Sequence, residues 1–186
     1  IEMQEIFLIL GLILLNGIFS MAEIALVSAR KARLESQAVK GDVRAREALE
    51  LANHPDTFLS TVQIGITLIG ILTGIFSGDK ITSDVASFFS RIPVLSAYSN
   101  GIATATVVII LTFFSMVLGE LLPKRIGLSN PEKIAKLVAG PMRFISKITH
   151  PFIWLLSKST HLLTRLLNVQ GNDTQVREEE SKAIIT

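Results

Sequence analysis

Three apolar runs without a single charged residue limit what this chain can fold into. They lie at residues 6–22, 57–78 and 92–119. An α-helix rises about 1.5 Å per residue, so roughly 20 apolar residues cross the hydrocarbon core of a bilayer. The second and third runs are long enough by themselves, and the first becomes so if its helix continues to Ala29. The sequence therefore predicts an all-α membrane protein with three transmembrane helices, at about residues 5–29, 57–78 and 97–121.

The composition supports a membrane domain and excludes several other classes of protein. The mean hydropathy of +0.50 is too high for an ordinary soluble domain. The chain has no cysteine, which excludes disulfides, thiol catalysis and cysteine-based zinc sites, and its three scattered histidines do not suggest a His-rich metal site. Neither a nucleophile–base arrangement nor a phosphate-binding glycine loop occurs, so we do not expect an enzyme.

The lysines and arginines predict the orientation of the chain. Six lie between the first and second runs, two between the second and third, and ten after the third. Loops rich in Lys and Arg stay on the cytoplasmic side of a membrane. We therefore expect a multi-pass protein of the plasma membrane with its N-terminus outside and its C-terminus in the cytoplasm. Anionic lipid at the inner surface explains these basic residues, so nucleic-acid binding is not expected.

The segments that flank the runs predict further helices on the cytoplasmic side. Residues 30–53 are rich in good helix formers and are interrupted at Gly41 and Asp42, which indicates two short helices ended by Pro55. Residues 131–167 are expected to form juxtamembrane helices. Within them, 144–167 has the spacing of a basic amphipathic helix that lies on the inner membrane surface. A buried fourth span is the alternative interpretation.

Each run also carries a stripe of polar or small residues along one helix face. The stripes are Asn16, Ser20 and Glu23 in the first predicted span, Gln63, Thr67, Gly70 and Gly74 in the second, and Thr112, Met116 and Glu120 in the third. The two glycines of the second run indicate close packing between helices. Polar side chains inside a bilayer usually face the bundle interior or water and serve a function. Counted from the cytoplasmic charges, the first two stripes meet at matching depths, and Glu120 lies slightly nearer the cytosol.

Pro123 predicts an unusual feature beside Glu120. Proline has no N–H and therefore cannot donate to the carbonyl four residues earlier, which belongs to Gly119. Inside a membrane such a carbonyl needs a partner or lines a polar cavity. A carboxylate with carbonyl, hydroxyl and amide oxygens suits a hard cation such as Mg²⁺, Na⁺ or Ca²⁺. Two simpler interpretations stay open: Glu120 ends the third span and pairs with Lys124, and Asn16 forms a hydrogen bond between helices.

At these residues the sequence resembles the transmembrane region, called DUF21, of the CNNM and CorC proteins, a hemolysin-related family associated with magnesium transport. The matching stretches are NGIFSMAEIALVSARKARLE in the first span, VQIGITLIGILTG in the second and GELLPKRIG after the third. Gly-Glu-x-x-Pro-Lys combined with Phe-Ser-x-x-Glu is fairly specific. The resemblance covers essentially the whole chain.

The resemblance implies a homodimeric transmembrane domain at residues 1–167, embedded in the lipid bilayer. Residues 168–186 would be a linker towards a cytoplasmic CBS pair, the only part that would bind ATP. Family members are thought to hold a largely dehydrated Mg²⁺ between the three spans and to exchange it for Na⁺. Carried over to this chain and joined with the neighbouring polar groups, the candidate metal ligands are Ser20, Glu23, Gln63, Thr67, Gly119 and Glu120.

This chain departs from the family pattern in the second span. Many relatives have asparagines there, whereas this chain has Ile66, Thr67 and Gly70, and Ala22 stands in the first span where some relatives have a second serine. The stretches VQIG and PKRIG also resemble a branch of the family that looks like polyamine exporters, and the carboxylates of Glu23 and Glu120 also suit a diamine such as putrescine or cadaverine. The leading hypothesis is a sodium-coupled magnesium exporter. The alternatives are a polyamine exporter and a non-transporting, membrane-anchored regulatory module.

Overall fold

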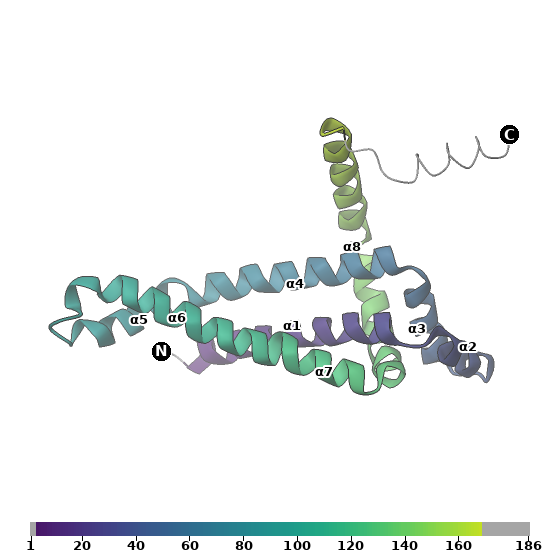
Figure 1. The fold of residues 1–186 in the computed structure, drawn as a ribbon, viewed down its shortest axis with the longest axis horizontal. Helices are drawn as coiled ribbons and strands as arrows, with labels where there is room; N and C mark the ends of the chain where they lie inside the picture. The colour runs from purple at the N-terminus through teal and green to yellow at the C-terminus, as the bar shows by residue number, and fades with distance from the viewer. Residues whose placement is uncertain (1–2, 169–186) are drawn as a thin grey trace, which may run out of the picture. The chain divides into compact units, whose positions relative to one another are not determined.

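The computed structural model describes residues 3–168, and every regular element in this range is a helix (Figure 1). The elements are α1 (Met3–Ser28), α2 (Lys31–Val39), α3 (Val43–Asn53), α4 (Pro55–Ser77), α5 (Asp79–Ser90), the 3-10 turn η1 (Ser96–Tyr98), α6 (Ser99–Met116), the π-turn η2 (Val117–Leu121), α7 (Leu122–Ser129) and α8 (Pro131–Leu166). The prediction of an all-α fold is confirmed. Most of the predicted linker at 168–186 lies outside the described residues.

Three helical segments of the described chain are long and apolar enough to cross a membrane. They are Met3–Ser28, Pro55–Ser77 and Ser96–Ser129, the last formed by η1, α6, η2 and α7 together. The three predicted spans are therefore confirmed. The third helical segment continues beyond the predicted end at residue 121, so Glu120 lies within it. Helix α5, which was not predicted, fills the connection between the second and third spans.

Local chemistry explains where the short helices begin and end. Gly41 has a φ of +98°, a left-handed conformation that glycine adopts without strain, and it separates α2 from α3. The Asp42 side chain then accepts hydrogen bonds from the backbone N–H groups of Arg44 and Ala45 and caps α3. Pro55 is the first residue of α4, where its missing N–H costs nothing. The predicted pair of short helices is confirmed.

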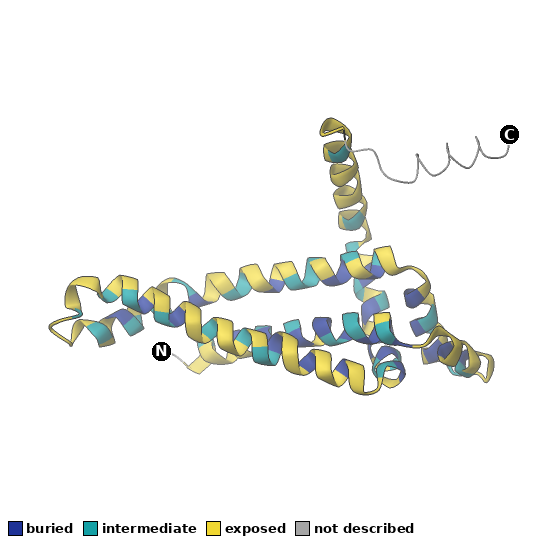
Figure 2. Cartoon of the chain, viewed as in Figure 1, coloured by how far each residue is buried: buried dark blue, intermediate teal, exposed yellow. Residues whose placement is uncertain are grey.

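The chain divides into two compact units, Ile1–Lys147 and Ile148–Thr186. The first unit contains α1 to α7 and residues 131–147 of α8. The second unit contains the remaining residues of α8, most of which have exposed side chains (Figure 2). The range predicted to hold juxtamembrane helices is thus one helix, α8, up to Leu166. Its predicted position on the inner membrane surface stays a prediction.

Helix α1 is the centre of the first unit. It packs against α4 on one side and against η2 and α7 on another, while α5 packs on α6 (Figure 1). Buried residues are accordingly more frequent along α1 than along α6 (Figure 2). The outward faces of α4 and α6 carry large exposed apolar side chains, among them Ile71, Ile75, Ile109 and Phe113. Such faces suit contact with lipid.

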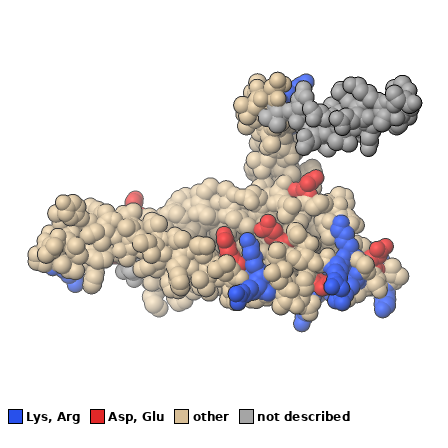
Figure 3. All heavy atoms as spheres, in the orientation of Figure 1, with Lys and Arg blue, Asp and Glu red and all other residues tan. Residues whose placement is uncertain are grey.

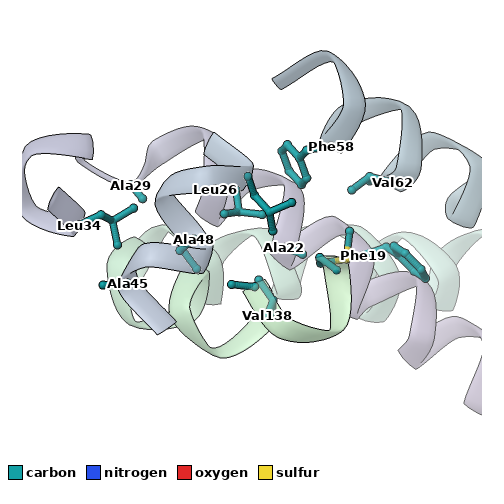
Figure 4. Close-up of a cluster of buried hydrophobic side chains, with 14 of the residues drawn as sticks. Phe19, Ala22, Leu26, Ala29, Leu34, Ala45, Ala48, Phe58, Val62 and Val138 are labelled. Carbon is teal, nitrogen blue, oxygen red and sulfur yellow. The ribbon is translucent and has the colours of Figure 1, made fainter. Parts of the chain in front are cut away.

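The hydrophobic core lies where α1, α4, α2, α3 and the first part of α8 meet. Figure 4 shows Phe19 and Leu26 of α1, Phe58 and Val62 of α4 and Val138 of α8 in this cluster. Small residues such as Ala22, Ala45 and Ala48 are fully buried there. Their size allows the helices to approach closely. This core fixes α1 relative to α4 near one end of the two helices.

Ion pairs surround this core at the end of the first unit that carries α2 and α3. Lys136 Nζ lies 3.1 Å from Asp42 Oδ2, and Arg143 pairs with Glu47 and Glu50. The buried Glu132 accepts from the backbone N–H of Arg30 and pairs with Arg33. On the face drawn in Figure 3, charged side chains gather at this end, and the surface along the apolar helices is nearly free of them. We call these pairs the α8 clamp, because each joins α8 to α2, α3 or the turns beside them.

Candidate functional site

A cavity of about 260 Å³ opens midway along the three apolar helices. Its lining comes from all three: Ile13 and Asn16 of α1, Ile66, Ile69, Gly70 and Thr73 of α4, Ser115 of α6 and Glu120 of η2. The lining thus combines one carboxylate, one amide and two hydroxyls with three isoleucines. We call it the Glu120 cavity.

The π-turn η2 determines how Glu120 is presented to this cavity. Within it the Leu122 N–H donates to the carbonyl of Val117, five residues earlier, instead of to the one four residues earlier. A π-turn contains one more residue than an α-helical turn. Residues five apart therefore come into line, which explains why Ser115 and Glu120 line the same cavity. The α-helical spacing predicted that Glu120 shares a face with Met116 and Thr112. All three side chains are exposed, and of the three only Glu120 lines the cavity.

Asn16 supplies the partner that the Gly119 carbonyl was predicted to need. Its Nδ2 lies 3.1 Å from the Gly119 oxygen and donates a hydrogen bond that joins α1 to η2. The carbonyl can only accept, so the amide nitrogen of Asn16 must be the end that faces it, and Oδ1 remains as an acceptor. The interpretation of Asn16 as a hydrogen-bonding residue between helices is confirmed. Glu120, by contrast, forms no ion pair with Lys124 in the described part of the chain.

Two of the predicted residues of α4 lie outside the cavity lining. Gln63 and Thr67 have exposed side chains, and Gln63 Nε2 donates to Thr67 Oγ1 at 3.4 Å. The cavity is lined by the neighbouring stripe from Ile66 to Thr73 instead. Thr67 is one residue beyond Ile66, which is about 100° of rotation around the helix axis. The Thr73 hydroxyl donates to the Ile69 carbonyl at 2.8 Å, so its oxygen lone pairs remain as acceptors in the cavity wall.

The predicted residues of α1 also lie apart from the Glu120 cavity. Ser20 is buried, with 2% of its surface exposed, and Glu23 is half-buried. Neither lines the cavity, which meets α1 at Ile13 and Asn16 instead. Of the six candidate ligands, the structure therefore brings together Glu120 and, through the bond to Asn16, the carbonyl of its neighbour Gly119. Asn16, Thr73 and Ser115 were not among them, although Pro123 signalled that the backbone near Glu120 is irregular.

Glycines bring α1 and the third helical segment into close contact beside the cavity. A Cβ atom at Gly17 would lie 2.8 Å from Pro123 Cγ and 2.9 Å from the Leu118 oxygen, and one at Gly127 would lie 2.9 Å from the Met21 oxygen. The prediction for Gly70 and Gly74 was wrong, because a Cβ at either would meet no atom within 4 Å. On α4 the close approach is at Gly65, against the ring of Phe19. Gly70 instead leaves open space in the cavity wall.

The charges available in the described residues limit the kind of cation that this cavity suits. No group of three or more His, Cys, Asp or Glu side chains that could hold a metal ion occurs among residues 3–168. The Glu120 cavity thus offers one negative charge and a few neutral oxygens. Such a set suits a cation that keeps part of its water, as Mg²⁺ does, or an organic ammonium ion whose carbon chain contacts the isoleucines.

The clearest electrostatic effect outside the three helices is at Asp42. The side-chain hydrogen bond from Lys136, followed by the backbone N–H of Ala45, lowers the pKa of this carboxyl below its ordinary value of 3.8. The cap of α3 and the α8 clamp therefore share one carboxylate.

Comparison with known proteins identifies the family. Residues 7–186 match the model of the family described as the cyclin M transmembrane N-terminal domain, CNNM. A UPF0053 protein of Synechocystis sp. is 46% identical over 182 residues, which is 97% of this chain and 41% of the relative. The polyamine export protein of Haemophilus influenzae is 32% identical over 176 residues, 95% of this chain and 40% of the relative. The UPF0053 protein YhdP of Bacillus subtilis is 31% identical over 188 residues, covering 100% of this chain and 42% of the relative.

The chain spans about two fifths of the length of these curated relatives. The family match extends over almost all of the chain and includes the three apolar helices and the π-turn with its glutamate. The protein therefore belongs to the CNNM family, also named DUF21 and UPF0053, and is a membrane protein.

Proposed function

We propose that this domain exports a cation from the cytosol across the plasma membrane and that Glu120 binds the cation on its way. The observation that carries the proposal is the carboxylate of Glu120, an exposed residue that lines a cavity midway along three apolar helices. A charged side chain at such a depth costs on the order of 2.5 to 3.5 kcal/mol even on a lenient scale, and residues of this kind mark ion and substrate pathways in membrane proteins. Family membership and relatives named as export proteins support transport.

Mg²⁺ is the first candidate for the transported ion. A water molecule occupies about 30 Å³ in the liquid, so the cavity volume of about 260 Å³ has room for an ion with several waters. Mg²⁺ commonly keeps several waters and binds one or two carboxylates. The Glu120 carboxylate would supply the negative charge, and the Thr73 and Ser115 hydroxyls would accept hydrogen bonds from the water molecules of the ion. We propose a partly hydrated ion here. Exchange for Na⁺, the homodimer and nucleotide binding by a CBS pair stay predictions from the family resemblance.

A polyamine is the second candidate, and two observations favour it. Ile13, Ile66 and Ile69 give the cavity an apolar wall that suits methylene groups. Relatives in Haemophilus influenzae, Salmonella typhimurium and Escherichia coli are named polyamine export proteins. The single carboxylate would then bind one ammonium group of the amine.

Flux measurements on the full chain in liposomes test the proposal with Mg²⁺ and putrescine in parallel. We expect Glu120→Gln, which removes the charge and keeps the shape, to lower export at least about tenfold, since even residues that only support a ligand commonly cost 10- to 100-fold. Glu35→Gln on exposed α2 is the control and should export like the unmodified protein. Full export by a folded Glu120→Gln variant would overturn the proposal. Loss of export in Glu23→Gln but not in Glu120→Gln would indicate that the cation site lies nearer Ser20.

A further inference from the structure

The contact between α1 and the π-turn carries an inference about how Glu120 is held. Pro123 cannot donate to the Gly119 carbonyl, and the Asn16 amide, from a different helix, donates to it at 3.1 Å. Glu120 is the next residue along the chain. The position of its backbone therefore depends on a bond that comes from outside its own helix.

Close packing of α1 against the π-turn fixes the position of this hydrogen bond. A Cβ at Gly119 would lie 3.1 Å from Asn16 Nδ2, and one at Gly17 would lie 2.9 Å from the Leu118 oxygen. Neighbouring residues of α1, Asn16 and Gly17, thus meet neighbouring residues of the π-turn, Leu118 and Gly119. A side chain does not fit at Gly17 without a shift of the backbone, and one at Gly119 would press on the Asn16 amide itself, so the close approach of the two helices brings the amide and the carbonyl together.

The π-turn is also the element whose shape decides which way Glu120 faces. If the turn relaxed to an α-helix, it would lose one residue per turn, and the residues after it would rotate by about 100° relative to Ser115. Glu120 would then leave its alignment with Ser115 and turn away from Thr73. The Asn16 hydrogen bond holds the carbonyl in the middle of the π-turn and opposes this change.

We propose that Asn16 is a positioning residue: its amide holds the π-turn in the form that presents Glu120 to the cavity. The inference rests on the proposed function in that it assigns Asn16 a part in the same cation site. The inference concerns the direction in which the side chain of residue 120 points, however, and this direction can be measured without measuring transport.

Crosslinking between two introduced cysteines measures that direction. The sequence contains no cysteine, so Thr73→Cys combined with Glu120→Cys gives one defined pair across the Glu120 cavity. A short bis-methanethiosulfonate reagent should join the pair rapidly in the full chain in nanodiscs. We expect Asn16→Ala to slow the reaction about threefold to tenfold, the effect expected for the loss of one hydrogen bond between membrane helices.

Ile9→Val is the matched control, because Ile9 is a buried residue of α1 outside the cavity lining. It should loosen packing slightly and leave the crosslinking rate unchanged. An unchanged rate in Asn16→Ala, or an equal fall in Ile9→Val, would overturn the proposal. Slower crosslinking together with normal export by Glu120→Gln would support the role of Asn16 and reject the proposed cation site, so the two ideas fail separately.

Pro123→Ala provides a second test, and its single variant does not depend on the folding of Asn16 variants. It restores the N–H that bonds to Gly119 in an α-helix. We expect the π-turn to relax and the crosslinking rate to fall, while the unfolding temperature falls no more than in the Ile9→Val control. Adding Asn16→Ala to Pro123→Ala should then change the rate little, because the carbonyl already has a donor. Independent, multiplicative effects of the two substitutions would contradict the proposal.

Discussion

Single residues decide the geometry of the Glu120 cavity. The Asn16 amide donates a hydrogen bond to the Gly119 carbonyl. This bond is needed because Pro123 has no N–H that could donate to the same carbonyl. The π-turn then aligns Ser115 with Glu120, five residues away. A proline inside a membrane helix is usually explained as a kink. In this protein it has a more specific effect, because another helix supplies the missing donor.

Gly17 offers a residue-scale prediction about the same contact. Gly17→Ala would place a Cβ 2.9 Å from the Leu118 oxygen, which belongs to the backbone and cannot rotate away. We expect the free energy of unfolding to fall by about 1–3 kcal/mol, as is typical of overpacking. Gly11→Ala on the same helix is the control: a Cβ there meets nothing within 4 Å, and alanine is the better helix former by about 1 kcal/mol. Unfolding in detergent measures both, and equal stability of the two variants would argue against the close contact.

At the scale of elements, α8 is attached to the rest of the first unit by both the core and the α8 clamp. Val138 and Met142 pack in the core, and the Ser146 hydroxyl lies 3.0 Å from the hydroxyl of the buried Thr61 on α4. The ion pairs with Asp42, Glu47 and Glu132 add to this attachment. Any movement of the first part of α8 would therefore disturb its contacts with α1, α3 and α4 together.

The clamp predicts a pH dependence that belongs to α3 and α8. Lys136 lowers the pKa of Asp42 in the folded protein, so this carboxylate contributes stability above its unfolded value of 3.8 and loses it as the pH falls through the lower folded pKa. Asp42→Asn keeps a capping oxygen and removes the charge. We expect the unmodified protein to melt at a slightly higher temperature than Asp42→Asn at neutral pH, and the difference to shrink as the pH falls below 3.8 and to vanish below the lower folded pKa. The effect is small because the pair is only half-buried and solvent screens it. A difference that persisted in acid would show that the charge is not its cause.

At the scale of the whole molecule, charge and hydropathy divide the first unit into a charged end and an apolar length. The charged end carries α2 and α3, whereas α5 connects the second and third helical segments at their other end (Figures 1 and 3). Lys80 of α5 pairs there with Glu5 of α1 at 3.1 Å. The positive-inside rule predicts that α2 and α3 lie in the cytoplasm, which would place α5 outside.

Cysteine labelling of intact cells tests this orientation with two matched positions. Val39 at the end of α2 and Val94 after α5 are each 83% exposed, so both are open to a reagent. We expect a membrane-impermeant maleimide to label Val94→Cys in intact cells and Val39→Cys only after the cells are permeabilised. The opposite pattern would invert the orientation and, with it, the direction of the proposed export.

The sequence alone determined the three spans and the pair of short helices, and only the tertiary structure decided which of their faces meet. Span length, the break at Gly41 and the helix start at Pro55 are local properties, so the three spans and the pair of short helices were predicted correctly. The rotation of each helix about its axis is not local: a difference of one residue turns a side chain by about 100°, which separates Thr67 from Ile66 on α4. Pro123 predicted an irregular backbone. Only the tertiary structure decided that the irregularity is a π-turn bonded to Asn16, because this bond depends on how closely Gly17 and Gly119 let two helices approach.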